Sequence, residues 1–299
     1  MHWRTKLITA AVGVAAAATM FGTQLAHGQV VTGLPLVNKG GINPNSWKYG
    51  PRNDDATGGV IWNPAKLEMM AGGDVIGRTM QSNNQTTLDA MNIAYCNLAS
   101  DPTADFTWTE MQHDQRDWNA AARMWRTCPN ARAVPGVRIA YTDEREIQHA
   151  LDGGAMVLVV PTVDTVEEAE EVVQWAYYPP FGRRSQGGTQ TAAVLGPWLA
   201  AKGLTNAQYR QTFNNNLVLI VMIETIEGVK NADKIAKVPG VTGVFAASGD
   251  LGNFSGFAEG DADYEKLITE VHDAALKAGK RLCGPFRWVD RPGFTCFQN

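Results

Sequence analysis

The chain has 299 residues, of which 44% are hydrophobic, and its formal net charge at pH 7 is −4. The length suits one large α/β domain. The slightly acidic balance excludes nucleic acid and anionic membrane surfaces as expected partners.

The first 28 residues have the pattern of a signal peptide. Arg4 and Lys6 give a basic start, Leu7–Phe21 is apolar, and small residues suited to cleavage follow at Ala26–Gly28. The apolar stretch is short for a membrane span, so an uncleaved anchor is the less favoured alternative. We therefore expect a mature chain of about 270 residues that is exported, to the periplasm or outside the cell, and leaves the membrane after cleavage.

Residues 29–73 are predicted to form an extended N-terminal arm, because their first part is rich in Gly, Asn and Pro and has no steady period. From residue 74 onward, apolar runs typical of strands alternate with segments of helical period. The predicted strands span residues 74–80, 106–111, 133–139, 156–161, 217–224, 241–247, 281–285 and 293–297. Helices are predicted over residues 86–96, 114–128, 142–154 (with a Thr cap and a Gly-Gly stop), 165–178, 225–238 and 263–280. A polar insertion follows residue 178, and a loop follows residue 247.

Eight strands that alternate with helices predict a (β/α)8 TIM-type barrel over residues 74–299, with no final helix after the eighth strand. An open doubly wound sheet is the alternative, but no Gly-x-Gly-x-x-Gly loop follows the first strand. The four cysteines match no zinc motif, and their pairing is left open. Cys283 and Cys296 could bridge from neighbouring strands, and isolated buried thiols are the alternative.

Two apolar runs end on carboxylates, LVLIVMI on Glu224 and VFAASG on Asp250. A helix-period segment joins the two runs, so their strands should lie parallel and adjacent, with both carboxylates at the same end. Two acids in that position either repel each other or hold a cation.

Functional residues of a barrel lie at the carboxyl ends of its strands. The polar residues that close or follow apolar runs come from four strands, and they are Glu110, His113, Arg138, Glu224 and Asp250. Taken singly, an ion pair or a histidine at a helix start would explain each as well. Their convergence at one rim favours a functional site.

These residues lie in motifs that resemble the class II pyruvate aldolases, the HpcH/HpaI aldolase and citrate lyase β group. The similar segments are EMQH (110–113), PGVR (135–138), GAMVLVVPTVDTVEEA (154–169), YYPPFGRRSQG (177–187), MIET (222–225) and GVFAASGDLGNFSG (243–256). The resemblance implies a (β/α)8 barrel that binds a divalent cation and makes or breaks a carbon–carbon bond beside a 2-oxo acid.

By this resemblance, Glu224 and Asp250 are the metal ligands, and their oxygen atoms suit Mg²⁺, Mn²⁺ or Co²⁺. Arg138 would hold the enolate oxygen, and His113 would move the proton of the aldol hydroxyl. Glu110 would orient the histidine.

The resemblance also implies a set of substrate contacts. The backbone N–H groups of Gly249 and Asp250 would bind the substrate carboxylate. Arg184 would help to close the site, although a purely packing role is favoured for it because no strand end fixes its position.

The chain departs from the family pattern at several positions. Glu110 stands where the family usually has aspartate, Met222 stands where several aldolases have glutamine, and residues 246–249 replace a Gly-Pro-rich loop. The family's final helix, often exchanged between subunits, has no counterpart, so a homo-oligomer is a possibility that the resemblance does not define.

The sequence therefore predicts a metal-dependent carbon–carbon lyase that performs retro-aldol cleavage of a hydroxylated 2-oxo acid. An acyl-CoA lyase of the citrate lyase β or malyl-CoA lyase type is one alternative, but an exported protein seldom meets coenzyme A. A secreted barrel that binds a metal or an oxo acid without catalysis is the other.

Overall fold

The computed structural model describes residues 61, 63–80, 87–128, 131–187 and 206–299, with the side chains of 206–208 left out. Eight parallel strands form a closed barrel in chain order, and β1 pairs with β8 to complete it. The strands are β1 (Val75–Met80), β2 (Phe106–Glu110), β3 (Val134–Arg138), β4 (Val157–Val160), β5 (Val218–Ile223), β6 (Gly243–Ala246), β7 (Arg281–Pro285) and β8 (Phe294–Gln298). The predicted (β/α)8 fold is confirmed, and the sequence stops one residue after β8.

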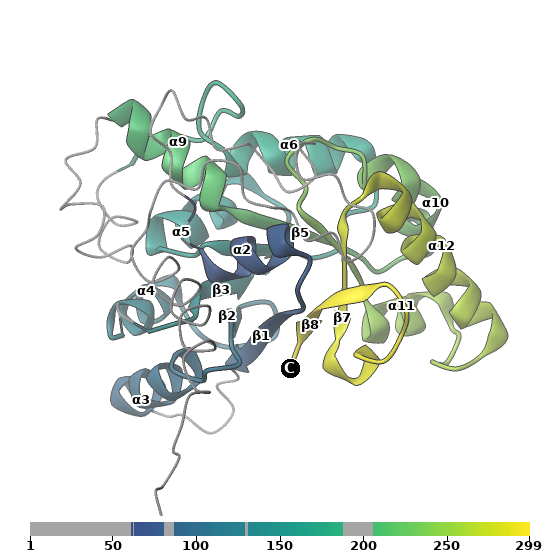
Figure 1. Cartoon of the computed structure of the whole chain (residues 1–299), viewed down its shortest axis with the longest axis horizontal. Coiled ribbons are helices and arrows are strands. Elements are labelled where there is room, and N and C mark those ends of the chain that lie inside the picture. The colour runs from purple at the N-terminus through teal and green to yellow at the C-terminus, as the bar shows by residue number, and fades with distance from the viewer. Residues whose placement is uncertain (1–60, 62, 81–86, 129–130, 188–205) are drawn as a thin grey trace, which may run out of the picture.

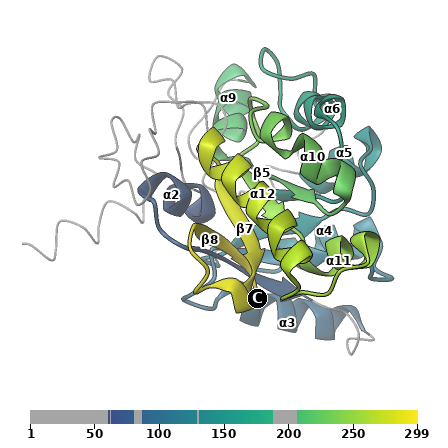
Figure 2. The same cartoon turned by 90° about the vertical axis from the view of Figure 1, so that its right-hand side faces the viewer.

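Helices surround the barrel (Figure 1). They are α2 (Pro64–Ala71), α3 (Leu88–Ala99), α4 (Trp118–Arg126), α5 (Glu144–Gly153), α6 (Val166–Ala176), α9 (Asn206–Asn216), α10 (Ile226–Ile235), α11 (Ser248–Ser255) and α12 (Ala262–Ala278), with the short 3₁₀ helix η3 (Phe286–Trp288). Figure 2 shows α2 and α11 on opposite sides of the strands. Among the described residues, no helix has the length and apolarity that crossing a membrane requires.

Several helix predictions need correction. Helix α4 begins at Trp118, not near residue 114, because the Asp117 side chain accepts the N–H of Ala120 and caps the helix there. The cap of α5 is Asp143 rather than Thr142, whose hydroxyl donates to the carbonyl of Pro161.

Three described helices were not predicted at all, namely α2, α9 and α11. The predicted arm thus contains helix α2, while the predicted signal peptide and residues 188–205 of the insertion lie outside the described residues. Helix α11 replaces the predicted loop because Leu251 is fully buried and the Tyr264 hydroxyl donates to the carbonyl of Ser248.

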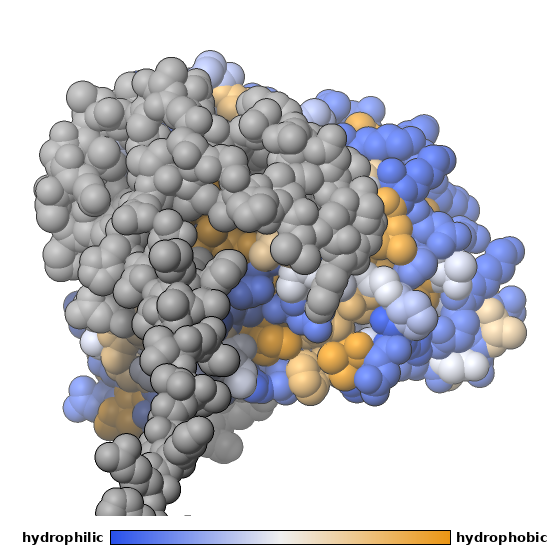
Figure 3. All heavy atoms as spheres, viewed as in Figure 1, coloured by the Kyte–Doolittle hydropathy of each residue, from blue (hydrophilic) through white to orange (hydrophobic). Residues whose placement is uncertain are grey.

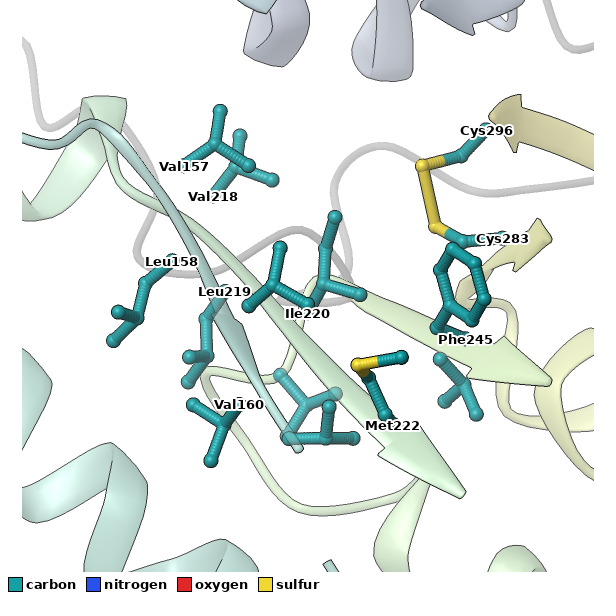
Figure 4. Packing of buried hydrophobic residues seen from close by; sticks show 14 of the residues in the cluster. Val157, Leu158, Val160, Val218, Leu219, Ile220, Met222, Phe245, Cys283 and Cys296 are labelled. Carbon is teal, nitrogen blue, oxygen red and sulfur yellow. A yellow bond between two sulfur atoms is a disulfide. The ribbon is translucent and has the colours of Figure 1, made fainter. Parts of the chain in front are cut away.

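Side chains alternate between the barrel interior and the helix layer. Figure 4 shows Leu158, Leu219 and Val160 on one side of the strands, and Ile220, Met222 and Phe245 on the other. The Phe106 ring lies so close to β1 and β3 that a Cβ on Gly77 or Gly136 would lie within 2.4 Å or 2.6 Å of it. Glycine on both neighbouring strands therefore makes room for this large ring.

Helix α2 closes the end of the barrel where the strands begin. Asn63 donates to the carbonyls of Met156 and Asn216, and buried Lys66 donates to the carbonyl of Leu217. The Arg281 guanidinium, on β7, donates to the carbonyl of Met69. These bonds hold the helix across one end and leave the opposite end to the strand–helix connections.

All four cysteines are paired, Cys96 with Cys128 and Cys283 with Cys296. The second disulfide joins β7 to β8 inside the core (Figure 4). On the outside, the face of α10 and α12 at the right of Figure 3 is largely hydrophilic, as expected for the outward faces of amphipathic helices.

Candidate active site

The carboxylate of Glu110, at the end of β2, makes contacts in two directions. Its Oε1 accepts the backbone N–H groups of Gln112 (2.7 Å) and His113 (3.2 Å). Its Oε2 accepts Nε of Arg138 at 2.8 Å and lies 2.5 Å from Nη2 of the same side chain. Glu110 therefore fixes the first turn after β2 and ties it to the end of β3.

His113 is held by its backbone and is exposed on the loop that follows β2. Within the described part of the chain, no hydrogen bond joins the Glu110 carboxylate to the imidazole. The sequence predicted that Glu110 orients His113. The contact between them is the hydrogen bond from the His113 backbone N–H to Glu110, so it positions the main chain rather than the imidazole.

Glu224 follows β5 and is almost fully buried. Its Oε2 accepts both the backbone N–H of Thr162 (2.6 Å) and the Thr162 hydroxyl (2.9 Å). Thr162 adopts the left-handed region, with φ of 47°, which is unusual for a β-branched residue and costs energy. The strained backbone after β4 thus serves to hold one carboxylate oxygen.

The other oxygen of Glu224, Oε1, is buried and makes no hydrogen bond to any residue that the structure describes. Burial raises the pKa of Glu224, and the charge of Asp250 acts in the same direction, while the Thr162 bonds and the charge of Arg138 lower it. Glu224 therefore lies within electrostatic range of both Asp250 and Arg138.

Asp250 is in the first turn of α11, whose N-cap Ala247 supplies no side-chain hydrogen bond. The neighbouring Gly249 is exposed, and a Cβ there would meet nothing within 4 Å. There is thus open space beside Gly249, and the N–H groups in the first turn of a helix, which have no intrahelical partner, favour an anion.

Charged groups alternate in sign across this end of the barrel. Electrostatic interactions link each group to the next in the order Asp114, Arg116, Glu110, Arg138, Glu224 and Asp250, and two of these links, Asp114–Arg116 (3.0 Å) and Glu110–Arg138 (2.5 Å), are ion pairs. The signs alternate up to the last pair, where two acids interact, and the set as a whole is two charges negative.

This arrangement fits a divalent cation. Within the described residues, Glu224 Oε1 is a buried acceptor without a hydrogen bond, and Asp250 is the second carboxylate of the interacting pair. These two side chains are the ones here that could hold a cation, and the described residues contain no group of three or more His, Cys, Asp or Glu side chains arranged to bind a metal.

Arg184 does not join this cluster. Its buried guanidinium pairs with Asp152 at 2.7 Å and stacks on the rings of Tyr178 and Phe213. Asp152 lies in the last turn of α5, which leads into the beginning of β4, at the opposite end of the barrel. This geometry favours the packing role for Arg184, and its predicted role in substrate binding stays a prediction.

Three residues that contact this charged set or belong to it, Thr162, Asp114 and Arg116, were not singled out from the sequence. Thr162 stands two residues after the end of β4, yet a threonine there is an ordinary loop residue. Asp114 and Arg116 lie in the run HDQRD (113–117), most of which was predicted to be helical. The only signal was that all three follow a predicted strand closely.

Comparison with known proteins identifies relatives of this chain. The family model for HpcH/HpaI aldolase/citrate lyase matches residues 111–281. A hydroxypyruvate/pyruvate aldolase of Delftia acidovorans is 39% identical over 153 residues, which cover 50% of this chain and 54% of the relative. A hydroxypyruvate/pyruvate aldolase of Agrobacterium fabrum is 32% identical over 183 residues, covering 60% and 66%.

The match therefore spans between about half and two thirds of the length of these curated relatives. Among solved structures, the HpcH/HpaI aldolase of Desulfitobacterium hafniense superimposes with a TM-score of 0.67 at 23% identity, covering 78% of this chain and 88% of that one. This likeness concerns the fold.

Proposed function

The chain belongs to the HpcH/HpaI aldolase/citrate lyase family, and on that premise we propose that it is a class II, divalent-metal-dependent aldolase. Its reaction is the retro-aldol cleavage of a hydroxylated 2-oxo acid, or the reverse addition. The observation that carries the proposal is the pair Glu224 and Asp250, two carboxylates that interact electrostatically, with Arg138 acting on Glu224 and with one buried Glu224 oxygen that has no hydrogen bond to the described residues. The activities for which the two relatives are named support the same reaction class.

Glu224 and Asp250 would hold the cation, with Mg²⁺, Mn²⁺ or Co²⁺ favoured by all-oxygen ligands. When bound, the cation supplies a Lewis acid for the keto and carboxylate oxygens of the 2-oxo acid. Thr162 keeps Glu224 in place through its two hydrogen bonds.

Arg138 stabilises the negative charge that develops on the enolate oxygen. Two of its nitrogens bind Glu110, which fixes the plane of the guanidinium before the substrate arrives. The backbone N–H groups of Gly249 and Asp250 lie in the first turn of α11, where there is open space beside Gly249, and they bind the substrate carboxylate.

His113 removes the proton from the substrate hydroxyl as general base. The bond between the third and fourth substrate carbons then breaks, its electron pair passes into the enolate of pyruvate, and the fourth carbon leaves as an aldehyde. Protonation of the enolate carbon gives pyruvate, so atoms and charges balance with no further reactant.

An assay of pyruvate release from a panel of 4-hydroxy-2-oxo acids, with and without Mg²⁺ or Mn²⁺, tests this function. We expect turnover that rises when metal is added and is lost in Glu224→Gln. Oxalate binding that requires metal, without any turnover across the panel, would instead identify a non-catalytic oxo-acid-binding barrel.

We also propose that the protein works in an oxidising compartment after export. The two disulfides support this, because thiols stay reduced in most cytoplasms. Thiol alkylation of protein recovered from cells should leave all four cysteines unmodified until a reductant is added, and alkylation without reductant would contradict the proposal.

Self-association is a further part of the proposal. Among the described residues, eight large apolar side chains are exposed, and six of them lie on segments that follow a strand: Leu88, Tyr141, Ile226, Phe254, Phe286 and Val289. Exposed apolar surface is typical of an interface between subunits. Light scattering should give a mass above one chain, and a lower mass for Phe254→Ser, while a monomeric wild type would exclude this part.

A further inference from the structure

The loop between β2 and α4 carries a second arginine beside the site. Glu110 holds the start of this loop through the backbone of Gln112 and His113, and Asp117 holds its end as the N-cap of α4. Arg116 lies between these two fixed points, at the end of the barrel that carries the active site.

The Arg116 side chain is only 1% exposed, yet Nε, Nη1 and Nη2 make no hydrogen bond to the described residues. Oδ2 of Asp114 lies 3.0 Å from Nη2, as in an ion pair, but outside hydrogen-bonding geometry. Leaving a buried donor unbonded is unfavourable, so most such groups in proteins find partners. A guanidinium with this many unused donors is suited to a ligand.

Glu110 does not accept hydrogen bonds from these Arg116 donors, although its charge acts on Arg116. One Glu110 oxygen already accepts two backbone N–H groups, and the other accepts Arg138. Both arginines interact electrostatically with the same carboxylate, and of the two only Arg138 is hydrogen-bonded to it among the described residues.

The position of Arg116 relative to His113 indicates which part of a substrate it would meet. His113 acts on the hydroxyl group, which is on the carbon derived from the aldehyde. Arg116 follows it by three residues on the same loop, which favours the aldehyde-derived half over the pyruvate half as the part that Arg116 would meet.

We propose that Arg116 is a specificity-determining residue that binds a terminal oxyanion, a carboxylate or a phosphate, on the aldehyde-derived half of the substrate. The planar guanidinium matches either group with two parallel hydrogen bonds. The bound anion takes the place of Asp114 beside Nη2. The inference rests on the proposed aldolase function and adds to it the class of aldehyde.

The test measures addition of pyruvate, in the presence of Mn²⁺, to two pairs of aldehydes. Succinic semialdehyde is compared with butanal, and glyceraldehyde 3-phosphate with glyceraldehyde, so the two pairs distinguish a carboxylate from a phosphate. We expect Arg116→Gln to lower kcat/KM for an anionic aldehyde by about 10–100-fold, mainly through KM, as loss of charge-assisted hydrogen bonds implies. Activity with the neutral members should change by less than about twofold.

Arg126→Gln is the matched control, because it removes the same charge from an exposed position on α4. Equal losses on anionic and neutral aldehydes, or no loss on either, would overturn the inference. If Arg116→Gln does not fold, Arg116→Lys keeps the charge without the planar fork and should lower the anionic-to-neutral ratio several-fold; an unchanged ratio contradicts the assignment. Wild-type protein active only on neutral aldehydes removes this inference alone, whereas protein inactive on all four removes the proposed function as well.

Discussion

At the scale of single residues, Glu110 shows how one side chain sets the positions of two others. One of its oxygens accepts the backbone N–H of His113, and the other accepts Nε of Arg138. Within the described residues, Glu110 is bonded to the backbone of His113 and not to its imidazole, so the proposed proton transfer is assigned to the His113 side chain.

Replacement of His113 by alanine should therefore lower kcat by about 10²–10⁴-fold, the usual range for loss of a general base. Metal-linked binding of oxalate, measured by calorimetry, should stay within a few-fold of wild type. His149→Ala, a change of the same type on the exposed side of α5, is the control. An unchanged kcat in His113→Ala would remove this residue from the mechanism.

Lys66 is a residue whose effect on stability depends on pH. Its burial, and secondly the charge of Lys280, lower the pKa to about 7 from an ordinary value of 10.5. Between these values the unfolded chain binds a proton that the folded chain does not, so the free energy of unfolding should rise with pH by up to about 1.4 kcal/mol per pH unit.

Chemical denaturation at pH 7 and pH 9 measures this slope. The wild type should gain stability over the interval, and Lys66→Met should gain less. Lys237→Met, at an exposed position paired with Asp233, should keep the slope of the wild type. The same pH dependence in all three proteins would show that Lys66 is not buried as a neutral amine.

At the scale of elements, β2 places large rings inside the barrel and a carboxylate at its end. Phe106 and Trp108 point inward with Glu110, and the Trp108 ring packs edge-on against Phe245 at 5.5 Å. The barrel interior below the charged side chains is therefore filled by aromatic rings. Its packing depends on the glycines that face Phe106.

Gly77→Ala should lower the free energy of unfolding by about 1–3 kcal/mol, because the new methyl group overlaps the Phe106 ring. Phe106→Leu in the same molecule removes the overlap, so the double variant should be less destabilised than the two single changes added together. Additive losses in a double-mutant cycle would show that the ring and the glycine do not interact.

Most strands and most helix starts could be predicted from local chemistry. The apolar runs identify all eight strands to within about two residues, and Thr165 begins α6 with a capping box as its sequence predicts. The shorter helices could not be predicted, since α2 and α11 are held by distant groups such as Arg281 and Tyr264. Those contacts exist only after folding.

The same limit applies to the site. Glu110, Arg138 and Glu224 directly close strands, so topology alone brings them to one end of the barrel. Thr162 holds Glu224 from a left-handed backbone conformation, and the Arg116 guanidinium is buried without a hydrogen bond to the described residues. Neither property can be read from the residue type. Disulfide pairing likewise required the register that places Cys283 opposite Cys296.

At the scale of the whole molecule, the two ends of the barrel differ. Helix α2 closes the end where the strands begin, and the other end carries an array of six charged groups. The chain ends with β8, which the disulfide to β7 and hydrogen bonds to β1 hold in place. A closed, cross-linked barrel thus provides a rigid support for the carboxylates.

The central claim is that Glu224 and Asp250 together bind a divalent cation. An anomalous-scattering map of a crystal of the full chain soaked in Mn²⁺ tests it most directly. We predict one strong peak within about 2.0–2.6 Å of a carboxylate oxygen of both residues, lost in Glu224→Gln. A map with no peak between these side chains, or with manganese only elsewhere, would contradict the account.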